Sequence, residues 1–424
     1  MKIHLDLDCF FVSCERLLYP DLRNRPVAVG GRGDPFIFNT DTRAVQTTAN
    51  NEGAFVPSVF YNAKTDFSAY FVEQGRIRGI VMTSSYEARA YGVKTGMSVR
   101  EALGLCPRLI VRAPNHLFYH ERSHALKEWL QTRIPVLEQY SIDEFFGDLS
   151  GWVADKDVPR FCQTLKQEIE KELGLPVSIG SAPSKWIAKL ATSAAKPGRG
   201  EGVKVLFRHE VDNFVNPLPI EAFPGIGRGF SRRLKAYKIE TLGELKQARH
   251  LLYRWKKPGI QLYHRVNGDD NEPVIPKRDR RSIGISRTVD PLYDRAQIRR
   301  RLTVLCRHLA HLVQNLGVTP QTLYLGIKYQ FGQKRARHVT EPFLFSEKAL
   351  RQRILALFEE LDIYKNLAVI RLSITCGHFA KRPAVSADLF VYEEEKKAQK
   401  LWRQTALLQK KYGIDTIRTA AEFL

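Results

Sequence analysis

Two pairs of acidic residues, far apart in the sequence, have the spacing of a metal-dependent site. Asp6 and Asp8 alternate along the strand-like segment 2–8, so their carboxylates share one face of the strand, opposite an apolar face. Asp143 and Glu144 are adjacent, so both can serve one site only near a hairpin turn or a bulge. Clustered carboxylates repel one another unless a cation neutralises them, and Mg²⁺ prefers oxygen ligands. The pattern indicates phosphoryl transfer assisted by two metal ions.

An ordinary structural role would also explain these acids. Short acidic motifs recur by chance, and both pairs could be acids at strand ends that face water. His4 lies on the same face as Asp6 and is more simply explained as a structural residue. The combination of two acidic pairs with a strongly basic chain is what favours nucleotidyl transfer.

Periodicity and helix-ending residues predict the elements that must position these side chains. Strand 2–8 is followed by a helix that Pro20 ends, and the second acidic pair lies in a strand-like run over 136–149. The predicted helices are 10–18, 98–105, 116–132, 158–173, 184–195, 294–315, 346–361 and 393–411. The predicted strands are 2–8, 136–149, 177–181, 282–289, 321–331 and 368–376. The alternation of strands and helices after residue 282 indicates an α+β module.

Composition excludes several classes of protein. The chain has 424 residues, of which 44% are hydrophobic and 10% aromatic, which is enough for folded cores and excludes a disordered chain. No stretch of about 18 uncharged apolar residues is present, so we expect no membrane span. The six cysteines form no CxxC pair, and the N-terminus lacks the apolar run of a secretory signal. These features predict a reduced, cytoplasmic protein.

Positive charge is concentrated in the last third of the chain. The formal net charge is +21, from 66 Lys and Arg against 45 Asp and Glu. Residues 277–382 hold 21 of the basic and 8 of the acidic residues, which is a net charge of 21 − 8 = +13. A solvated basic surface would have the same composition. The basic residues nevertheless come in clusters beside predicted strands, which favours contacts with a nucleic-acid backbone.

Five segments, in this order along the chain, carry a resemblance to a known family: HLDLDCFFVSCE, SSYEARAYGVKTGM, YSIDEFFGDLS, SAPSKWIAKLATSAAKPGRGEGV and PGIGRGFSRRL. They resemble the Y-family translesion DNA polymerases, most closely the bacterial DNA polymerase IV branch. The resemblance implies a multi-domain α+β fold, the right-hand polymerase. The implied domains are the palm (1–24 and 107–205), the fingers (25–106, with an aromatic-rich insertion at about 32–80), a small helical thumb with a helix-hairpin-helix (206–272), a linker (273–281), a C-terminal α+β little finger (282–382) and a tail (383–424).

The resemblance also implies an activity and its catalytic residues. It implies error-prone addition of dNTPs to a primer on a damaged template DNA, without proofreading. Asp6, Asp143 and Glu144 match the catalytic carboxylates, which would hold two Mg²⁺ ions together with the backbone carbonyl of Leu7. Asp8 matches the second acid of the first motif, and we expect it to have a supporting role.

Aromatic and basic residues near the acids match nucleotide contacts of the family. Phe11 matches the steric gate, a flat ring that leaves no room for a ribose 2′-hydroxyl, and Phe10 is expected beside the nucleotide. Without the family match, both would be interpreted as core aromatics. Tyr86 and Arg89 match fingers residues that grip the triphosphate.

Three lysines form a stripe on the helix predicted over 184–195. Lys185, Lys189 and Lys196 fall within about 40° of one another, opposite an apolar face. Such a stripe is usually a solvated surface. Lys196 matches a lysine of the family that contacts phosphate, whereas we expect Lys185 to remain at the surface.

Two further segments match DNA contacts. Gly225 and Gly227 lie in a PGIG sequence that resembles the hairpin of a helix-hairpin-helix, although a tight turn would have the same sequence. Glycines there would let backbone N–H groups approach a DNA phosphate. The cluster of Arg299, Arg300 and Arg301 lies where the family has its little finger, and we expect it to contact the DNA backbone.

Residues 385–390, VSADLF, resemble the short peptide that docks bacterial polymerases on the sliding clamp. Leu389 and Phe390 would fill an apolar pocket on the clamp. Ser386 stands where the peptide usually has Gln, which predicts weak affinity. Alternatively, the segment is a final strand that packs on the last domain.

Two other functions compete with an active polymerase. A catalytically idle scaffold that binds DNA and the clamp would have lost the acids, whereas Asp6, Asp143 and Glu144 are all present. A nucleotidyl cyclase also uses paired acids, but the thumb hairpin and the basic last module argue against it. We expect a monomer.

Overall fold

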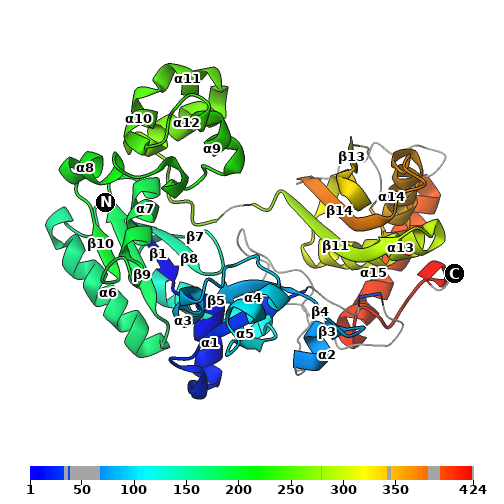
Figure 1. The fold of residues 1–424 in the computed structure, drawn as a ribbon. Coiled ribbons are helices and arrows are strands. Elements are labelled where there is room, and N and C mark those ends of the chain that lie inside the picture. Colours follow the sequence, from blue (N-terminus) through cyan, green and yellow to red (C-terminus); the bar gives the residue numbers. More distant parts are fainter. Residues whose placement is uncertain (33–36, 39–66, 278, 341–344, 381–391, 423–424) are drawn as a thin grey trace. The chain divides into compact units, whose positions relative to one another are not determined.

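The computed structural model describes residues 1–32, 37–38, 67–277, 279–340, 345–380 and 392–422 (Figure 1). The chain divides into two compact units. Among the described residues, the first unit contains 1–31 and 67–277, and the second contains 32, 37–38 and those from 279 onward. The segments expected to form palm, fingers and thumb lie in the first unit, and the segment expected to form the little finger lies in the second.

A five-stranded sheet, with the strand order β10-β9-β1-β8-β7, forms the centre of the first unit. The strands are β1 (Lys2–Leu7), β7 (Val136–Gln139), β8 (Glu144–Asp148), β9 (Val177–Ala182) and β10 (Val203–Val205). β1 lies between β8 and β9 and is antiparallel to both. Its residues Ile3, Leu5 and Leu7 are buried, as the alternating pattern predicts.

Helices cover both faces of this sheet. They are α1 (Phe10–Leu18), α5 (His116–Gln131), α6 (Val158–Leu173) and α7 (Lys185–Ala195). α1, α5 and α6 share one core with the apolar face of β1. α7 packs on the other face, where His4 Nδ1 lies 2.9 Å from Thr192 Oγ1. Gly180 on β9 permits this approach, because a Cβ there would lie 2.3 Å from the Ala188 carbonyl oxygen and the Thr192 nitrogen.

A smaller, three-stranded sheet with the order β5-β2-β6 occupies the position expected for the fingers. Its strands and helices are β2 (Val27–Gly31), β5 (Ile80–Ser84), β6 (Ile110–Arg112), α3 (Tyr86–Ala90) and α4 (Val99–Leu105). The end of the expected insertion forms α2 (Phe67–Phe71), β3 (Val72–Glu73) and β4 (Arg76–Ile77). Tyr70 and Phe71 are buried there, and most of the insertion lies outside the described residues.

The segment expected to be the thumb is helical. Its helices are α8 (Val211–Val215), α9 (Arg228–Lys235), α10 (Leu242–Gln247), α11 (Arg249–Arg254) and α12 (Lys256–Asn267). Their apolar residues, such as Leu234, Leu245 and Val266, share one core with Trp186 and Ile187 of α7. The helix that carries the lysine stripe therefore packs on both the palm sheet and the thumb.

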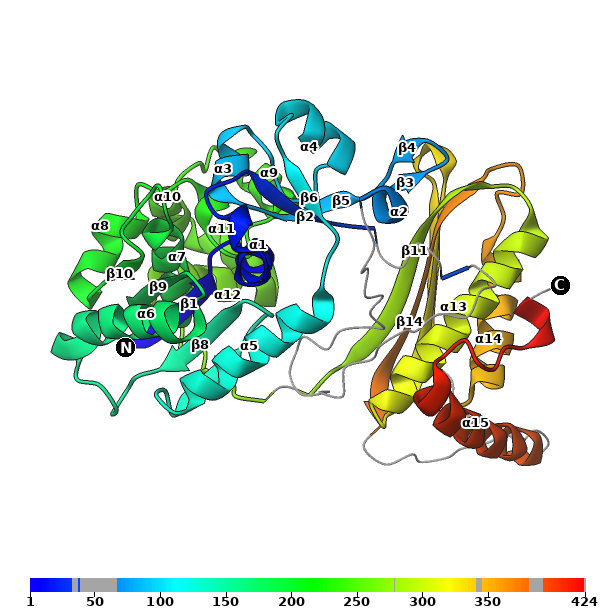
Figure 2. The ribbon, with the colours of Figure 1, turned by 90° about the horizontal axis from the view of Figure 1, so that it is seen from below.

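The second unit contains an antiparallel sheet with the order β11-β14-β12-β13. Its elements are β11 (Ser282–Leu292), α13 (Arg295–Asn315), β12 (Thr319–Tyr329), β13 (Lys334–Thr340), α14 (Glu347–Leu361), β14 (Val369–Ala380) and α15 (Tyr392–Tyr412). α13 and α14 lie on one side of the sheet (Figure 2). Ile37 is buried in the core of this unit, so part of the expected insertion belongs to it.

The described part of the expected tail is not a free tail. Arg307 of α13 is 3% exposed and holds three groups of the C-terminal segment. Its Nη2 lies 2.9 Å from Asp415 Oδ1 and its Nε 3.0 Å from Glu422 Oε1, and its Nη1 donates to the Ile414 carbonyl at 2.6 Å. Because α15 also packs against α14, the residues 392–422 belong to the second unit.

The predicted helices are confirmed, with ends within one residue of the predicted ones. The predicted strand 136–149 is instead the hairpin β7–β8, and the strands β2 to β6, β10 and β13 were not predicted. Within the described ranges, no helix has both the length and the apolar character that crossing a membrane requires.

Candidate active site

The pairing of β1 with β8 brings the two acidic motifs together. Asp6 and Glu144 are direct partners in the antiparallel register, and the Leu7 N–H donates to the Asp143 carbonyl at 3.0 Å. Asp143 lies in the turn between β7 and β8, and Glu144 is the first residue of β8. Because the turn interrupts the strand alternation, adjacent acids can reach one site, as the sequence required.

The electrostatic surroundings of these acids favour a cation. Burial raises the pKa of Asp143 above its ordinary value, and the negative charge of Asp6 raises it further. Burial also raises the pKa of Glu144, although its ion pair with Lys189 partly opposes this shift. Negative charge is therefore concentrated where water hydrates it poorly.

Two lysines at α7 neutralise part of this charge. Lys196 Nζ lies 2.9 Å from Asp6 Oδ1, and Lys189 forms an ion pair with Glu144. All four side chains keep 16–29% of their surface exposed. No role was predicted for Lys189, although it belongs to the same lysine stripe as Lys196, which is the C-cap of α7.

The oxygen donors at this site fit a hard divalent cation. Asp6, Asp143 and Glu144 supply carboxylates, and burial raises the pKa of Asp143 and of Glu144, so a cation beside them would stabilise their charged forms. Over the described ranges, no three His, Cys, Asp or Glu side chains form a ready-made metal site. The ammonium groups of Lys189 and Lys196 pair with two of the carboxylates in this arrangement.

Asp8 has a different environment from Asp6. It is 5% exposed, and it accepts hydrogen bonds from the Tyr86 hydroxyl at 3.0 Å and the Ser178 hydroxyl at 2.8 Å. The Arg89 guanidinium lies over the Tyr86 ring, 4.8 Å from its centroid. α3, which carries Tyr86 and Arg89, begins at Ser85, whose side chain accepts from the Ala88 N–H. Asp8 thus holds the Tyr86 hydroxyl, and its supporting role at the site stays a prediction.

The adjacent phenylalanines after the first acids have different environments. Phe10 is 2% exposed and packs in the palm core, so its expected place beside the nucleotide is not supported. Phe11 is half-buried, and its ring stacks on Tyr119 with a centroid distance of 4.5 Å and an angle of 14°. Of these two rings, only that of Phe11 is partly exposed, which a contact with the nucleotide requires.

Lys185 is not at the surface, as was expected, but buried. Its side chain is 1% exposed, and its Nζ lies 2.5 Å from Glu138 Oε2, which is equally buried. The same carboxylate accepts the Ile275 N–H at 2.8 Å. The partner lies 47 residues away on β7, and nothing local in the sequence indicates the pair.

The PGIG segment forms a turn at the start of a basic helix. Gly225 has φ +98°, a conformation that favours glycine, and Gly227 is the N-cap of α9. Among the described residues, no atom would lie within 4 Å of a Cβ added at either position. α9 itself carries Arg228, Arg232, Arg233 and Lys235. The backbone of this turn is accessible to a phosphate.

The arginine cluster of α13 lies on the helical side of the second unit. Arg299 forms an ion pair with Glu359 at 2.7 Å, and the Arg301 guanidinium lies 4.8 Å from the Phe38 ring centroid. The structure leaves Arg300 half-buried.

The other side of the sheet presents a second basic group. Lys328 of β12 is the register partner of Lys334 on β13 and of Arg371 on β14, so the three side chains share one face. The buried neighbours Ile327 and Leu372 point to the opposite face, toward the core. This row has no local signature in the sequence, because it depends on the pairing of three strands.

Leu389 and Phe390 lie outside the described residues. Their segment connects β14, which ends at Ala380, to α15, which begins at Tyr392. Both flanking elements belong to the second unit.

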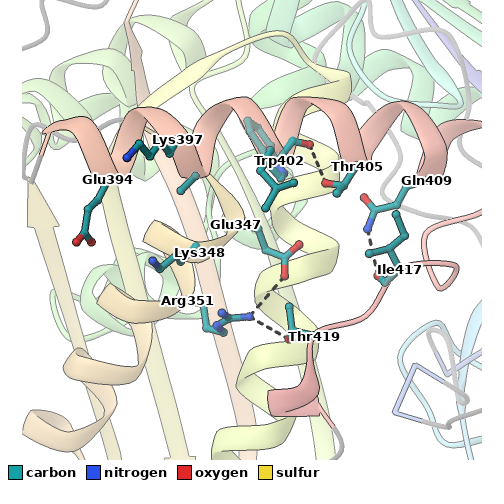
Figure 3. Close-up of a pocket in the computed structure, with 12 residues that line it drawn as sticks. Glu347, Lys348, Arg351, Glu394, Lys397, Trp402, Thr405, Gln409, Ile417 and Thr419 are labelled. Atoms are coloured by element: carbon teal, nitrogen blue, oxygen red, sulfur yellow. Dashed lines mark hydrogen bonds and ion pairs between the residues drawn. The ribbon is translucent and has the colours of Figure 1, made fainter.

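A cavity of about 540 Å³ lies between α14 and α15, in the second unit (Figure 3). Trp402 and Leu401 line its apolar part, and Arg351 reaches from α14 to Thr419 at 3.0 Å. The acids of the palm belong to the other unit, so this cavity is not part of the candidate active site.

Family models match most of the chain. The impB/mucB/samB family model matches residues 5–193, and the model of its C-terminal domain matches residues 280–389. The chain belongs to this family, the Y family of DNA polymerases. The matched ranges include the acidic motifs, the lysine stripe and the sheet of the second unit.

Curated relatives support this Y-family membership. The DNA polymerase IV of Clostridium kluyveri is 32% identical over 81% of this chain and 77% of the relative. That of Oceanobacillus iheyensis is 30% identical over 98% of this chain and 90% of the relative. Among solved structures, a Y-family DNA polymerase chimera matches with a TM-score of 0.70, covering 90% of this chain and 99% of the other at 22% identity. The last match supports the Y-family fold.

Proposed function

We propose that this chain is a DNA-directed DNA polymerase that performs translesion synthesis, with Asp6, Asp143 and Glu144 as its metal-binding carboxylates. The observation that carries the proposal is the meeting of both acidic motifs at one end of the β1–β8 pair, beside the lysines of α7. Its relatives are named DNA polymerase IV, which supports the same function. Y-family membership implies a divalent metal, and the paired carboxylates favour two Mg²⁺ ions.

The chain's own residues position the reactants. Asp6, Asp143, Glu144 and the Leu7 carbonyl would hold the ions, which lower the pKa of the primer 3′-hydroxyl and stabilise charge on the phosphates. Lys196 lies beside Asp6 and is close enough to the acids to bind phosphate oxygens of a dNTP.

The fingers residues would bind the triphosphate from another side. Arg89 is exposed above the Tyr86 ring and presents guanidinium donors from the short helix α3. The Tyr86 hydroxyl donates its one proton to Asp8, so it would have to turn from Asp8 to donate to a phosphate. Phe11 would exclude ribonucleotides, because its ring follows the acids of the first motif closely and is partly exposed.

Both units would contribute to binding the primer–template. In the first unit, Gly225 and Gly227 would present backbone N–H groups to a phosphate. In the second, the row of Lys328, Lys334 and Arg371 on the sheet and the arginine cluster of α13 supply positive charge for the DNA backbone.

We retain the sliding clamp as a proposed partner, through Leu389 and Phe390. The motif lies in the connection between β14, which ends at Ala380, and α15, which begins at Tyr392. A monomeric state and a cytoplasmic location remain predictions from the sequence.

Primer extension on undamaged and lesion-bearing templates tests the proposed function. Asp143→Ala and Glu144→Ala should each reduce extension at least about 10³-fold, because each removes a ligand of the ions. Binding of the primer–template, measured by fluorescence anisotropy, should stay within a few-fold of wild type.

Asp148→Ala is the matched control. Asp148 lies at the other end of β8 and pairs with Lys2, so this variant should keep its activity. Extension at near wild-type rate by either of the first two variants would contradict the site. Wild-type protein that binds DNA without extending it would instead support the idle scaffold.

A further inference from the structure

Phe11 is the second residue of α1 and is flanked by two rings of α5. Its ring stacks on Tyr119, and the His116 ring meets it edge-on with a centroid distance of 6.3 Å and an angle of 89°. His116 and Tyr119 are also in edge-to-face contact at 6.2 Å. Since a phenylalanine side chain has several staggered rotamers, these contacts select one of them.

Tyr119 is itself fixed in place. It is fully buried, and its hydroxyl donates to Glu15 Oε1 at 2.7 Å. Glu15 is 2% exposed, and its other oxygen accepts Nε of Arg112 at 3.2 Å. A hydrogen bond to a buried, charged carboxylate is strong, so the Tyr119 ring cannot turn away freely.

Glu15, which holds the Tyr119 hydroxyl, lies on the same helix as Phe11. Glu15 lies four residues after Phe11 on α1, one helical turn along the same side. Tyr119 therefore contacts α1 twice, once through its ring at Phe11 and once through its hydroxyl at Glu15. Two contacts to one helix determine the position of the Phe11 ring relative to its own backbone.

We propose that Tyr119, held by Glu15, is a positioning residue for sugar selection, which it performs by fixing the Phe11 ring in the orientation that excludes a ribose 2′-hydroxyl. This inference rests on the proposed function, in which Phe11 is the gate. It assigns to α5 of the palm a role in substrate choice, although Tyr119 has no contact with the nucleotide in this scheme.

The test compares kcat/KM for a dNTP and the matching rNTP in single-nucleotide primer extension. Phe11→Ala should raise relative rNTP use most. Tyr119→Leu removes the stacked ring and should raise it by up to about tenfold, since a stacked aromatic pair is worth about 0.5–1.5 kcal/mol. Tyr119→Phe keeps the ring but loses the hydroxyl, and we expect a smaller rise.

A destabilised palm is the main alternative cause of such a change. Leu126→Ala on the same helix removes another fully buried side chain, two turns beyond Tyr119, and serves as the matched control. It should lower the melting temperature, as Tyr119→Leu does, without changing the dNTP/rNTP ratio.

The outcomes separate the inference from the function on which it rests. If Phe11→Ala leaves the ratio unchanged, Phe11 is not the gate. If Phe11→Ala raises rNTP use but Tyr119→Leu does not, the positioning role is overturned while the gate stands. Should Tyr119→Leu fail to fold, Tyr119→Phe and His116→Ala decide, and an unchanged ratio in both overturns the inference.

Discussion

Each of the two units contains a cluster of paired charges, and the two clusters differ in burial. At the acids of the palm, the paired lysine and carboxylate side chains keep 16–29% of their surface exposed. In the second unit, Arg307, Asp415 and Glu422 are each 3% exposed. Both clusters pair basic side chains with carboxylates, but only the pairs at Asp6 and Glu144 are partly exposed to water.

This difference separates exchangeable pairs from permanent ones. Solvent-exposed ion pairs contribute about 0–1 kcal/mol, and the half-buried pairs at Asp6 and Glu144 lie between that value and the buried limit, so a lysine there can leave its carboxylate at a lower cost than Arg307 when another cation or a phosphate arrives. Breaking a buried pair leaves an uncompensated charge and costs about 3–5 kcal/mol. The palm pairs suit a site that must exchange partners, and the Arg307 cluster suits the attachment of the C-terminal segment.

The largest expected effect is on stability. Arg307→Leu should lower the free energy of unfolding by about 3–5 kcal/mol in urea denaturation, because Asp415 and Glu422 would remain buried without their partner. Arg299→Leu, which breaks an exposed pair with Glu359, is the control and should cost at most about 1 kcal/mol. Equal losses in the two variants would remove the distinction between the clusters.

The next effect concerns the segment before α15. Replacing Leu389 and Phe390 together by Ala should reduce clamp-stimulated synthesis by about 10²-fold, because a tether raises the local concentration of the polymerase at the primer. Clamp-free synthesis and the melting temperature should not change. Leu407 and Leu408 of α15, 68% and 47% exposed, form the control pair. If the variant is less stable and loses both activities equally, the segment has a structural role instead.

Smaller effects on the melting temperature are expected for two acids of the β7–β8 hairpin, Asp143 and Asp148, and the two effects should have opposite signs. The pKa of Asp143 is raised in the folded state, so its charge destabilises the fold above the ordinary carboxyl pKa, and Asp143→Asn should raise the melting temperature at pH 7–8. As the pH falls through the raised pKa, the wild-type carboxyl takes up a proton and the difference should vanish.

Asp148 provides the opposite case. Burial raises its pKa, but the hydrogen bonds from Lys2 and Ser150 and the positive charge of Lys2 together outweigh burial, and the net shift of the pKa is downward. Asp148→Asn should therefore lower the melting temperature at neutral pH, and the difference should disappear as the pH falls through the lowered pKa. Shifts of the same sign in both variants would show that charge is not the cause.

The smallest effect is expected in the salt dependence of DNA binding. Changing Lys328, Lys334 and Arg371 to Gln should reduce the slope of log K against log salt concentration by up to about 0.9 for each lost phosphate contact. The same change at Arg299, Arg300 and Arg301 should reduce it less, because Arg299 pairs with Glu359 within its own unit. A larger reduction by the arginine variant would place the DNA backbone on the helical side.

The sequence predicts elements whose signals are local. Strand 2–7 follows from strict alternation, and Gly174, with φ +65°, ends α6 where a glycine is expected. β13, KRARHVT, was missed because its apolar residues do not alternate and its pairing with β12 supplies its stability.

The candidate site is predictable in its acids but not in its counter-ions. Asp6 and Glu144 are recognisable by motif, whereas the pairing of Glu144 with Lys189 depends on how α7 packs against the sheet. The burial of Lys185 could not be predicted either, because its partner Glu138 lies on a different element. Long-range contacts of this kind have no signature in a single sequence.

The positions of Lys189 and Lys196 depend on Gly180, although Gly180 itself would contact none of the reacting groups. α7 approaches β9 so closely there that a single added methyl group would meet its backbone. The helix would have to move outward and would carry Lys189 and Lys196 away from their carboxylates. A mutational survey would then record a loss of affinity for the triphosphate at a residue that no search for ligands would select. Substitution of Gly180 is therefore limited by the close packing of α7 on β9, although Gly180 would make no contact with the substrate.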